Sequence, residues 1–132
     1  MSMSRPAEIG SLKEGMYVVV DGEPSRVVTI EKSKPGKHGS AKVRLVAVGV
    51  FDNVKRSIVS PVDAKVDVPM IDKRNGQVIS VSRNTVQIMD LESFEVLEVA
   101  NIEAELLDKL KPSVEVEYWM IMGRPKLIRV KS

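Results

Sequence analysis

Short segments rich in valine and isoleucine follow one another along the first half of the chain, and turn residues separate them. No helical period of apolar residues occurs there, so the pattern predicts strands at 16–20, 26–30, 43–50, 56–60 and 64–68. The pair Asp21-Gly22 suits a tight hairpin because glycine readily adopts positive φ, and Ser60-Pro61 indicates a further break. Five short strands predict a small barrel.

A second series of strands follows the segment around Pro69. The pair Asn75-Gly76 is typical of a turn, and we place the domain boundary between residues 70 and 71. Further turns are expected at 83–84 and at 123–125. The predicted strands of this half are 77–82, 85–89, 95–99, 114–122 and 127–131.

One predicted helix, at 101–111, interrupts the second series. Asn101 can cap its first turn, and Pro112 ends it. Acidic residues precede basic ones along the segment, as the helix dipole favours. Three strands, a helix and two strands predict an OB-type barrel. The apolar residues that share one face of this helix are Ile102, Leu106, Leu107 and Leu110.

The strand predicted at 114–122 carries the only adjacent aromatic pair, Tyr118 and Trp119. Side chains alternate along a strand, so Tyr118 shares a face with Val114 and Val116, and Trp119 lies on the opposite face. The pair could stack on nucleic-acid bases, but a stacking surface needs several clustered rings and aromatic residues make up only 4% of the chain. Packing in a core or an interface is the favoured interpretation.

Composition excludes several kinds of site. The 132 residues include 43% hydrophobic and 29% charged residues, which is typical of a globular protein. Because the chain has no cysteine and one histidine, His38, disulfides, thiolate metal sites and cysteine nucleophiles are excluded, and we expect no metal site. No segment reads as a signal peptide or a membrane span, so we expect a cytoplasmic protein without a membrane partner.

Charge is unevenly distributed although the net charge is only +2. The stretch 90–108 contains acidic residues and no lysine or arginine, and such a run is commonly a solvated face. The stretch 32–51 contains no acidic residue. Its cations are Lys32, Lys34, Lys37, Lys42 and Arg44.

The basic stretch includes a loop, 33–42, that joins two predicted strands. Gly36 and Gly39 can adopt positive φ, so a tight turn can present Lys37 and His38 at its apex. Lys34 and Lys42 lie on either side of this turn, and a phosphate backbone would compensate their mutual repulsion.

Two catalytic interpretations of the loop fail. A phosphate-binding P-loop needs an earlier glycine where Glu31 stands and a Ser or Thr where His38 stands. A histidine base at an exposed hairpin tip would lack a nucleophile and a water-excluding pocket. We therefore expect no enzyme activity and no catalytic residues.

The segment Lys34-Pro35-Gly36-Lys37-His38-Gly39-Ser40-Ala41-Lys42 resembles the hypusination loop of the translation initiation factor 5A family, particularly its archaeal form. The family is related to bacterial elongation factor P. The segments at 43–50, 51–52, 55–57 and 61–69 are also similar, and the resemblance covers essentially the whole chain. Pro35 stands where eukaryotic members usually have Thr, and Ser40 where they usually have His, so contacts of those two side chains cannot be transferred.

The resemblance implies an all-β protein of two small barrels, a basic SH3-like barrel at 1–70 and an OB-fold with one short helix at 71–132. It also implies that Lys37 is converted to hypusine or deoxyhypusine by deoxyhypusine synthase, which uses NAD to transfer an aminobutyl group from spermidine. No cofactor is expected to stay bound.

Partners implied by the resemblance are the ribosome and peptidyl-tRNA, and we expect a monomer in solution. The arm on Lys37 would lie near the acceptor end of the tRNA, promote peptide bonds at stalled sites such as polyproline, and assist termination. Lys34, Gly36, His38, Gly39 and Lys42 would form the RNA- and ribosome-binding loop. The alternative is a generic two-barrel RNA-binding or RNA-chaperone protein that needs no modification.

Overall fold

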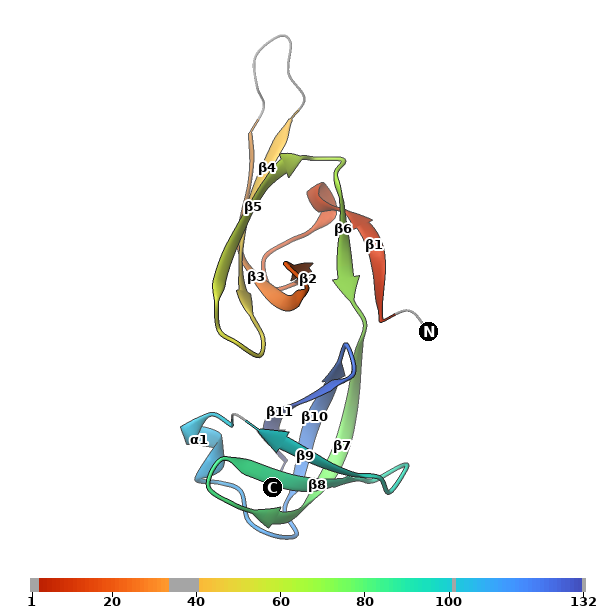
Figure 1. Ribbon diagram of the computed structural model, residues 1–132, viewed down its shortest axis with the longest axis vertical. Helices are drawn as coiled ribbons and strands as arrows, with labels where there is room; N and C mark the ends of the chain where they lie inside the picture. Colours follow the sequence, from red (N-terminus) through yellow and green to blue (C-terminus); the bar gives the residue numbers. More distant parts are fainter. Residues whose placement is uncertain (1–2, 34–40, 101, 132) are drawn as a thin grey trace. The chain divides into compact units, whose positions relative to one another are not determined.

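The computed structural model describes residues 3–33, 41–100 and 102–131. The chain divides into two compact units, Met1–Met70 and Ile71–Ser132. Each unit is built on one antiparallel sheet (Figure 1). Among the described residues, no helix is long and apolar enough to cross a membrane.

The first unit is a six-stranded sheet with the order β1-β6-β2-β3-β4-β5. Its alternating burial follows the side-chain period of a strand: in β4, Val43, Leu45 and Ala47 face the core while Lys42 and Arg44 are exposed. The elements are β1 (Ser4–Glu8), the 3₁₀ helix η1 (Ile9–Ser11), β2 (Tyr17–Val20), β3 (Glu23–Ser33), β4 (Lys42–Gly49), β5 (Lys55–Pro61) and β6 (Lys65–Pro69).

The hairpin predicted at Asp21-Gly22 is confirmed. Both residues have positive φ, 51° and 80°, which suits the right-handed twist of the paired strands β2 and β3. The break predicted at Ser60-Pro61 is present but begins slightly later, because β5 ends at Pro61, which still pairs with Lys42 of β4, and β6 begins at Lys65. Strand β1 and helix η1 were not predicted from the sequence.

The second unit is a five-stranded sheet with the order β11-β10-β7-β8-β9. Its two edge strands, β9 and β11, lie close to each other, so the sheet curls into a barrel. This arrangement, with one short helix between the third and fourth strands, is the predicted OB-type barrel. The elements are β7 (Ile71–Val81), β8 (Thr85–Asp90), β9 (Val96–Ala100), α1 (Ala104–Leu107), β10 (Glu115–Ile121) and β11 (Arg124–Val130).

The turn predicted at Asn75-Gly76 is wrong, because β7 begins at Ile71 and continues through both residues. Gly76 is needed for close packing rather than for a turn. A Cβ at this position would lie 3.2 Å from the carbonyl oxygen of Met89 and 3.4 Å from the ring of Tyr118. The turn expected at 123–125 instead occupies Met122 and Gly123, both with positive φ, and β11 starts at Arg124.

The helix is shorter than predicted. Glu103 occupies its N-cap position, and Asn101, the predicted cap, lies outside the described residues. Beyond Leu107 the backbone bonds span three residues, from Lys109 N–H to Leu106 and from Leu110 N–H to Leu107, so the α-helical pattern ends after one turn. The predicted apolar face is confirmed: Leu110 is buried in the core of the second unit, and Ile102, Leu106 and Leu107 pack against that core.

Candidate functional site

Strands β3 and β4 pair as a hairpin (Figure 1), and the predicted modification loop is the segment between them in the sequence. Ser33 lies opposite Lys42, which fixes the two ends of the loop side by side, and Val62 N–H donates to the carbonyl of Ala41 at 3.0 Å. Of the predicted loop residues, Lys42 is described and exposed. Lys34, Gly36, Lys37, His38 and Gly39 lie outside the described residues.

The base of this hairpin has one apolar and one polar face. Val43 and Leu45 are fully buried, and Ile30 packs against the same core, so the barrel holds both strands. Lys42 and Arg44 alternate with the buried residues of β4 and face solvent. Glu31 of β3 pairs directly opposite Arg44 and places one acidic side chain at the hairpin base. The described root of the loop therefore presents cations from a rigid support.

The second unit contains a buried charge cluster that sequence reasoning missed. Asp90, 1% exposed, accepts hydrogen bonds from Nε and Nη2 of Arg74 at 2.6 and 3.1 Å. It also accepts the hydroxyl proton of Tyr118 at 2.5 Å and the backbone N–H groups of Glu92 and Ser93 at 2.8 Å. The interpretation of 90–108 as a solvated acidic run is thus wrong for Asp90. The signal that could have revealed it is its place at the end of an apolar strand and directly before a turn.

These contacts shift the ionisation of all three side chains. The hydrogen bonds from Arg74 are the largest cause that holds the pKa of Asp90 far below its usual range, and the Asp90 bonds raise the pKa of Arg74. Burial, together with the bond to Asp90, raises the pKa of Tyr118 to about 12. The cluster therefore stays ionised at neutral pH, with Asp90 negative, Arg74 positive and Tyr118 protonated.

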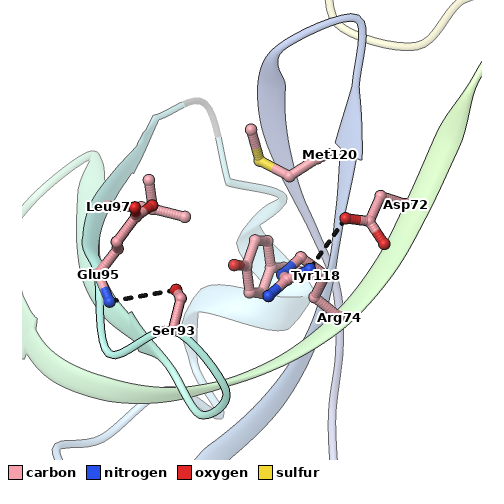
Figure 2. Close-up of a pocket in the computed structure, with 7 residues that line it drawn as sticks. All are labelled: Asp72, Arg74, Ser93, Glu95, Leu97, Tyr118 and Met120. Carbon is pink, nitrogen blue, oxygen red and sulfur yellow. Dashed lines mark hydrogen bonds and ion pairs between the residues drawn. The ribbon is translucent and has the colours of Figure 1, made fainter.

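A pocket of about 330 Å³ lies beside this cluster (Figure 2). Strands β7, β9 and β10 and the turn between β8 and β9 build its walls. Acidic side chains, Asp72 and Glu95, accompany apolar ones, Leu97 and Met120. The complete lining is Asp72, Arg74, Ser93, Glu95, Leu97, Tyr118 and Met120.

The aromatic pair of β10 divides between two faces, as predicted. Tyr118 is buried in the core, which rules it out as a stacking surface. Trp119 is half-buried on the other face, where its indole N–H donates to Glu117 at 2.7 Å and the Lys73 ammonium lies 4.7 Å from its ring centroid. Its ring is thus held by a cation–π contact and a hydrogen bond.

No group of three or more metal-ligating side chains gathers within the described ranges 3–33, 41–100 and 102–131. The buried side-chain nitrogen and oxygen atoms of these residues all have hydrogen-bond partners. The polar network around Asp90 is therefore satisfied without a bound ion.

Comparison with known proteins identifies the family. A family profile described as "Translation initiation factor 5A-like, N-terminal" matches residues 2–64. Translation initiation factor 5A of Pyrobaculum islandicum is 56% identical over 126 residues, which cover 94% of this chain and 96% of the relative. The chain belongs to the translation initiation factor 5A family. The Pyrococcus furiosus member is 53% identical over 95% of this chain and 93% of its own length.

Solved structures agree with this assignment. A structure titled eukaryotic translation initiation factor 5A from Methanococcus jannaschii is 46% identical, covers 98% of this chain and 96% of its own, and has a TM-score of 0.90. A family protein from Naegleria fowleri is 28% identical over 99% of this chain and 100% of its own, with a TM-score of 0.78. These likenesses confirm the predicted family and the all-β, two-barrel fold class. The relatives are named as translation factors rather than as enzymes.

Proposed function

We propose that this family member acts on the ribosome through a hypusine or deoxyhypusine arm on Lys37. The arm lies next to the acceptor end of peptidyl-tRNA, promotes peptide-bond formation at stalled sites such as polyproline, and assists termination. Membership of the translation initiation factor 5A family carries this proposal.

The hairpin base supports it. Lys42 and Arg44 are exposed on β4, whose alternate residues Val43 and Leu45 are anchored in the core. Exposed cations on a rigid strand suit contacts with RNA phosphates, which position a protein on its nucleic acid without reading sequence. We therefore assign Lys42, together with Lys34, Gly36, His38 and Gly39, to a loop that binds RNA and the ribosome.

The proposed modification lengthens the reach of one cation. Lysine carries a compact ammonium on a four-carbon stem, and an added aminobutyl group supplies a second protonatable nitrogen farther from the backbone. Such an arm can enter between nucleotides where a barrel cannot fit. The ribosome then performs the bond chemistry, and ordering the reactants can lower a barrier by several kcal/mol, about 7–11 at most.

Lys37→Arg tests the proposal because it keeps the charge but removes the amine that is modified. In a reconstituted translation assay, we expect this variant to lose its stimulation of synthesis through consecutive prolines. Lys42→Arg is the matched control, since it makes the same change in the same hairpin and should retain most activity. Normal stimulation by Lys37→Arg would refute the proposed role.

The intact mass of the protein from its native host tests the modification itself. We expect an increase that corresponds to one deoxyhypusine or hypusine, located at Lys37 by peptide mass spectrometry. An unmodified and fully active native protein would instead favour a generic RNA-binding protein with two barrels. The proposal further places the protein in the cytoplasm as a monomer, with deoxyhypusine synthase as the modifying enzyme and no cofactor held in either barrel.

A further inference from the structure

The pocket of the second unit combines a closed charge network with apolar walls. Asp72 and Arg74 come from β7, Ser93 and Glu95 from the segment between β8 and β9, Leu97 from β9, and Tyr118 and Met120 from β10. In Figure 2, Asp72 and Glu95 lie on opposite sides of Tyr118.

The guanidinium of Arg74, the basic group that lines this pocket, is already paired with carboxylates of the protein. Nε and Nη2 of Arg74 bind Asp90, Nη1 lies 3.0 Å from Asp72, and Nη2 lies 3.6 Å from Glu92. An anionic ligand would have to displace one of these carboxylates and would face the others. The pocket therefore excludes phosphates and carboxylates, although an OB-type barrel is a common carrier of nucleic-acid sites.

The rim of the pocket favours a cation. The Asp72 side chain is 61% exposed, and the Glu95 side chain is exposed. Asp72, Asp90 and Glu92 surround the one guanidinium of Arg74, and Glu95 adds a further carboxylate to the lining of the pocket. The local charge is thus negative where the pocket opens, and a cation there is attracted while remaining partly hydrated.

The walls favour an apolar stem behind that cation. Leu97 and Met120 are half-buried, and the ring of Tyr118 forms a further wall. A flexible thioether adapts to varied apolar shapes. The volume of about 330 Å³ is at the small end of ligand pockets, which suits a short aliphatic chain rather than a large ring system.

We propose that this pocket binds an alkylammonium group, with the ammonium at Glu95 on the acidic rim and the stem against Leu97 and Met120. The ligand is either the side chain of a lysine on another molecule or a free alkylamine, since both have the same chemistry. This site is distinct from the loop that bears Lys37, and its test does not depend on the proposed ribosomal function.

The full-length protein is titrated with n-butylamine and, separately, with Nα-acetyl-lysine methylamide, while methyl resonances are followed by NMR. We expect both to shift the methyl signals of Leu97 and Met120, with dissociation constants in the millimolar range that increase with salt. Sodium butyrate and 1-butanol, which share the stem but lack the cation, serve as ligand controls and should leave these signals in place.

Glu95→Gln should raise the dissociation constant about fivefold, because it removes one carboxylate next to the ammonium. Glu98→Gln is the matched control: Glu98 is exposed on β9, the strand that directly follows Glu95, lies opposite Gln87 and does not line the pocket, so the dissociation constant should change by less than about twofold. Selective shifts with the lysine amide alone support a protein lysine as the ligand, and shifts with butylamine alone support a free amine. The proposal is overturned if neither amine shifts the two methyl signals, if butyrate or butanol shifts them equally, or if the two variants behave alike.

Discussion

Replacing Asp90 with asparagine should destabilise the second unit strongly, although the side chain keeps its size. Asp90 accepts five hydrogen bonds: two from Arg74, one from Tyr118 and two from backbone N–H groups. Asparagine has one acceptor oxygen and one NH₂ donor. In either orientation of the amide, its NH₂ group faces N–H donors, either the Nε of Arg74 or the backbone N–H groups of the turn.

The magnitude follows from burial. Asp90 is 1% exposed, and removing one partner from a buried, hydrogen-bonded ion pair typically costs about 3–5 kcal/mol. Arg74 keeps its contacts with Asp72 and Glu92 near solvent, so we expect the lower end, about 3 kcal/mol. A unit of the size of Ile71–Ser132 has a total stability of about 3–9 kcal/mol. The substitution therefore removes a third or more of it.

Urea unfolding of the full chain measures this loss. Trp119 is the one tryptophan of the chain and lies on β10, so its fluorescence reports on the second unit. Tyr118→Phe, which removes one of the five donors, should cost about 1.5–2 kcal/mol. Glu98→Gln is the surface control and should change stability by less than about 0.5 kcal/mol. An Asp90→Asn protein as stable as that control would refute the reasoning.

Two further predictions concern acid stability and backbone packing. Because the pKa of Asp90 is low in the folded protein, the carboxyl of the unfolded chain takes up a proton first as the pH falls. The free energy of unfolding, followed by Trp119 fluorescence, should therefore decrease below about pH 4, and Asp90→Asn should flatten this dependence. Equal slopes for the two proteins would contradict this prediction. Gly10→Ala would place a Cβ 2.8 Å from the carbonyl oxygen of Val62, so it should destabilise the first unit by about 1–3 kcal/mol and accelerate amide hydrogen exchange in β4. Unchanged exchange in β4 would show that the backbone at Gly10 can move aside.

Strands with a clear alternation of apolar and polar residues could be predicted from the sequence. Val43, Leu45 and Ala47 follow the period of two, and the structure buries all three. The strand β1 lacks such a pattern: its sequence is SRPAE and none of its residues is fully buried. It forms because its backbone pairs with β6, from Ser4 opposite Pro69 to Glu8 opposite Lys65, and local sequence does not encode that distant partner.

Local rules also misassigned residues whose roles depend on distant contacts. Asn75-Gly76 has the composition of a turn, but Gly76 lies in β7, where it pairs with Val116 and Asp90 and the ring of Tyr118 packs closely against it. Asp90 belongs to an acidic run, but its charge is balanced by Arg74, 16 residues away in the sequence. A pattern within one segment can suggest that such a residue is unusual, but it cannot identify Tyr118 or Arg74 as the distant partner, since both contacts require the folded barrel.

Because Ser33 pairs with Lys42, the residues between them can change without altering the pairing register of the strands in the first unit. The chain leaves the sheet at Ser33 and re-enters it at Lys42, about one strand spacing away, roughly 5 Å. The alternation of buried and exposed residues in β4 then begins with the buried Val43. A deletion within β4 would turn its core side chains toward water, whereas an exchange of residues before Lys42 leaves that alternation intact. The barrel is thus suited to accept grafted loops of different length and chemistry without being redesigned.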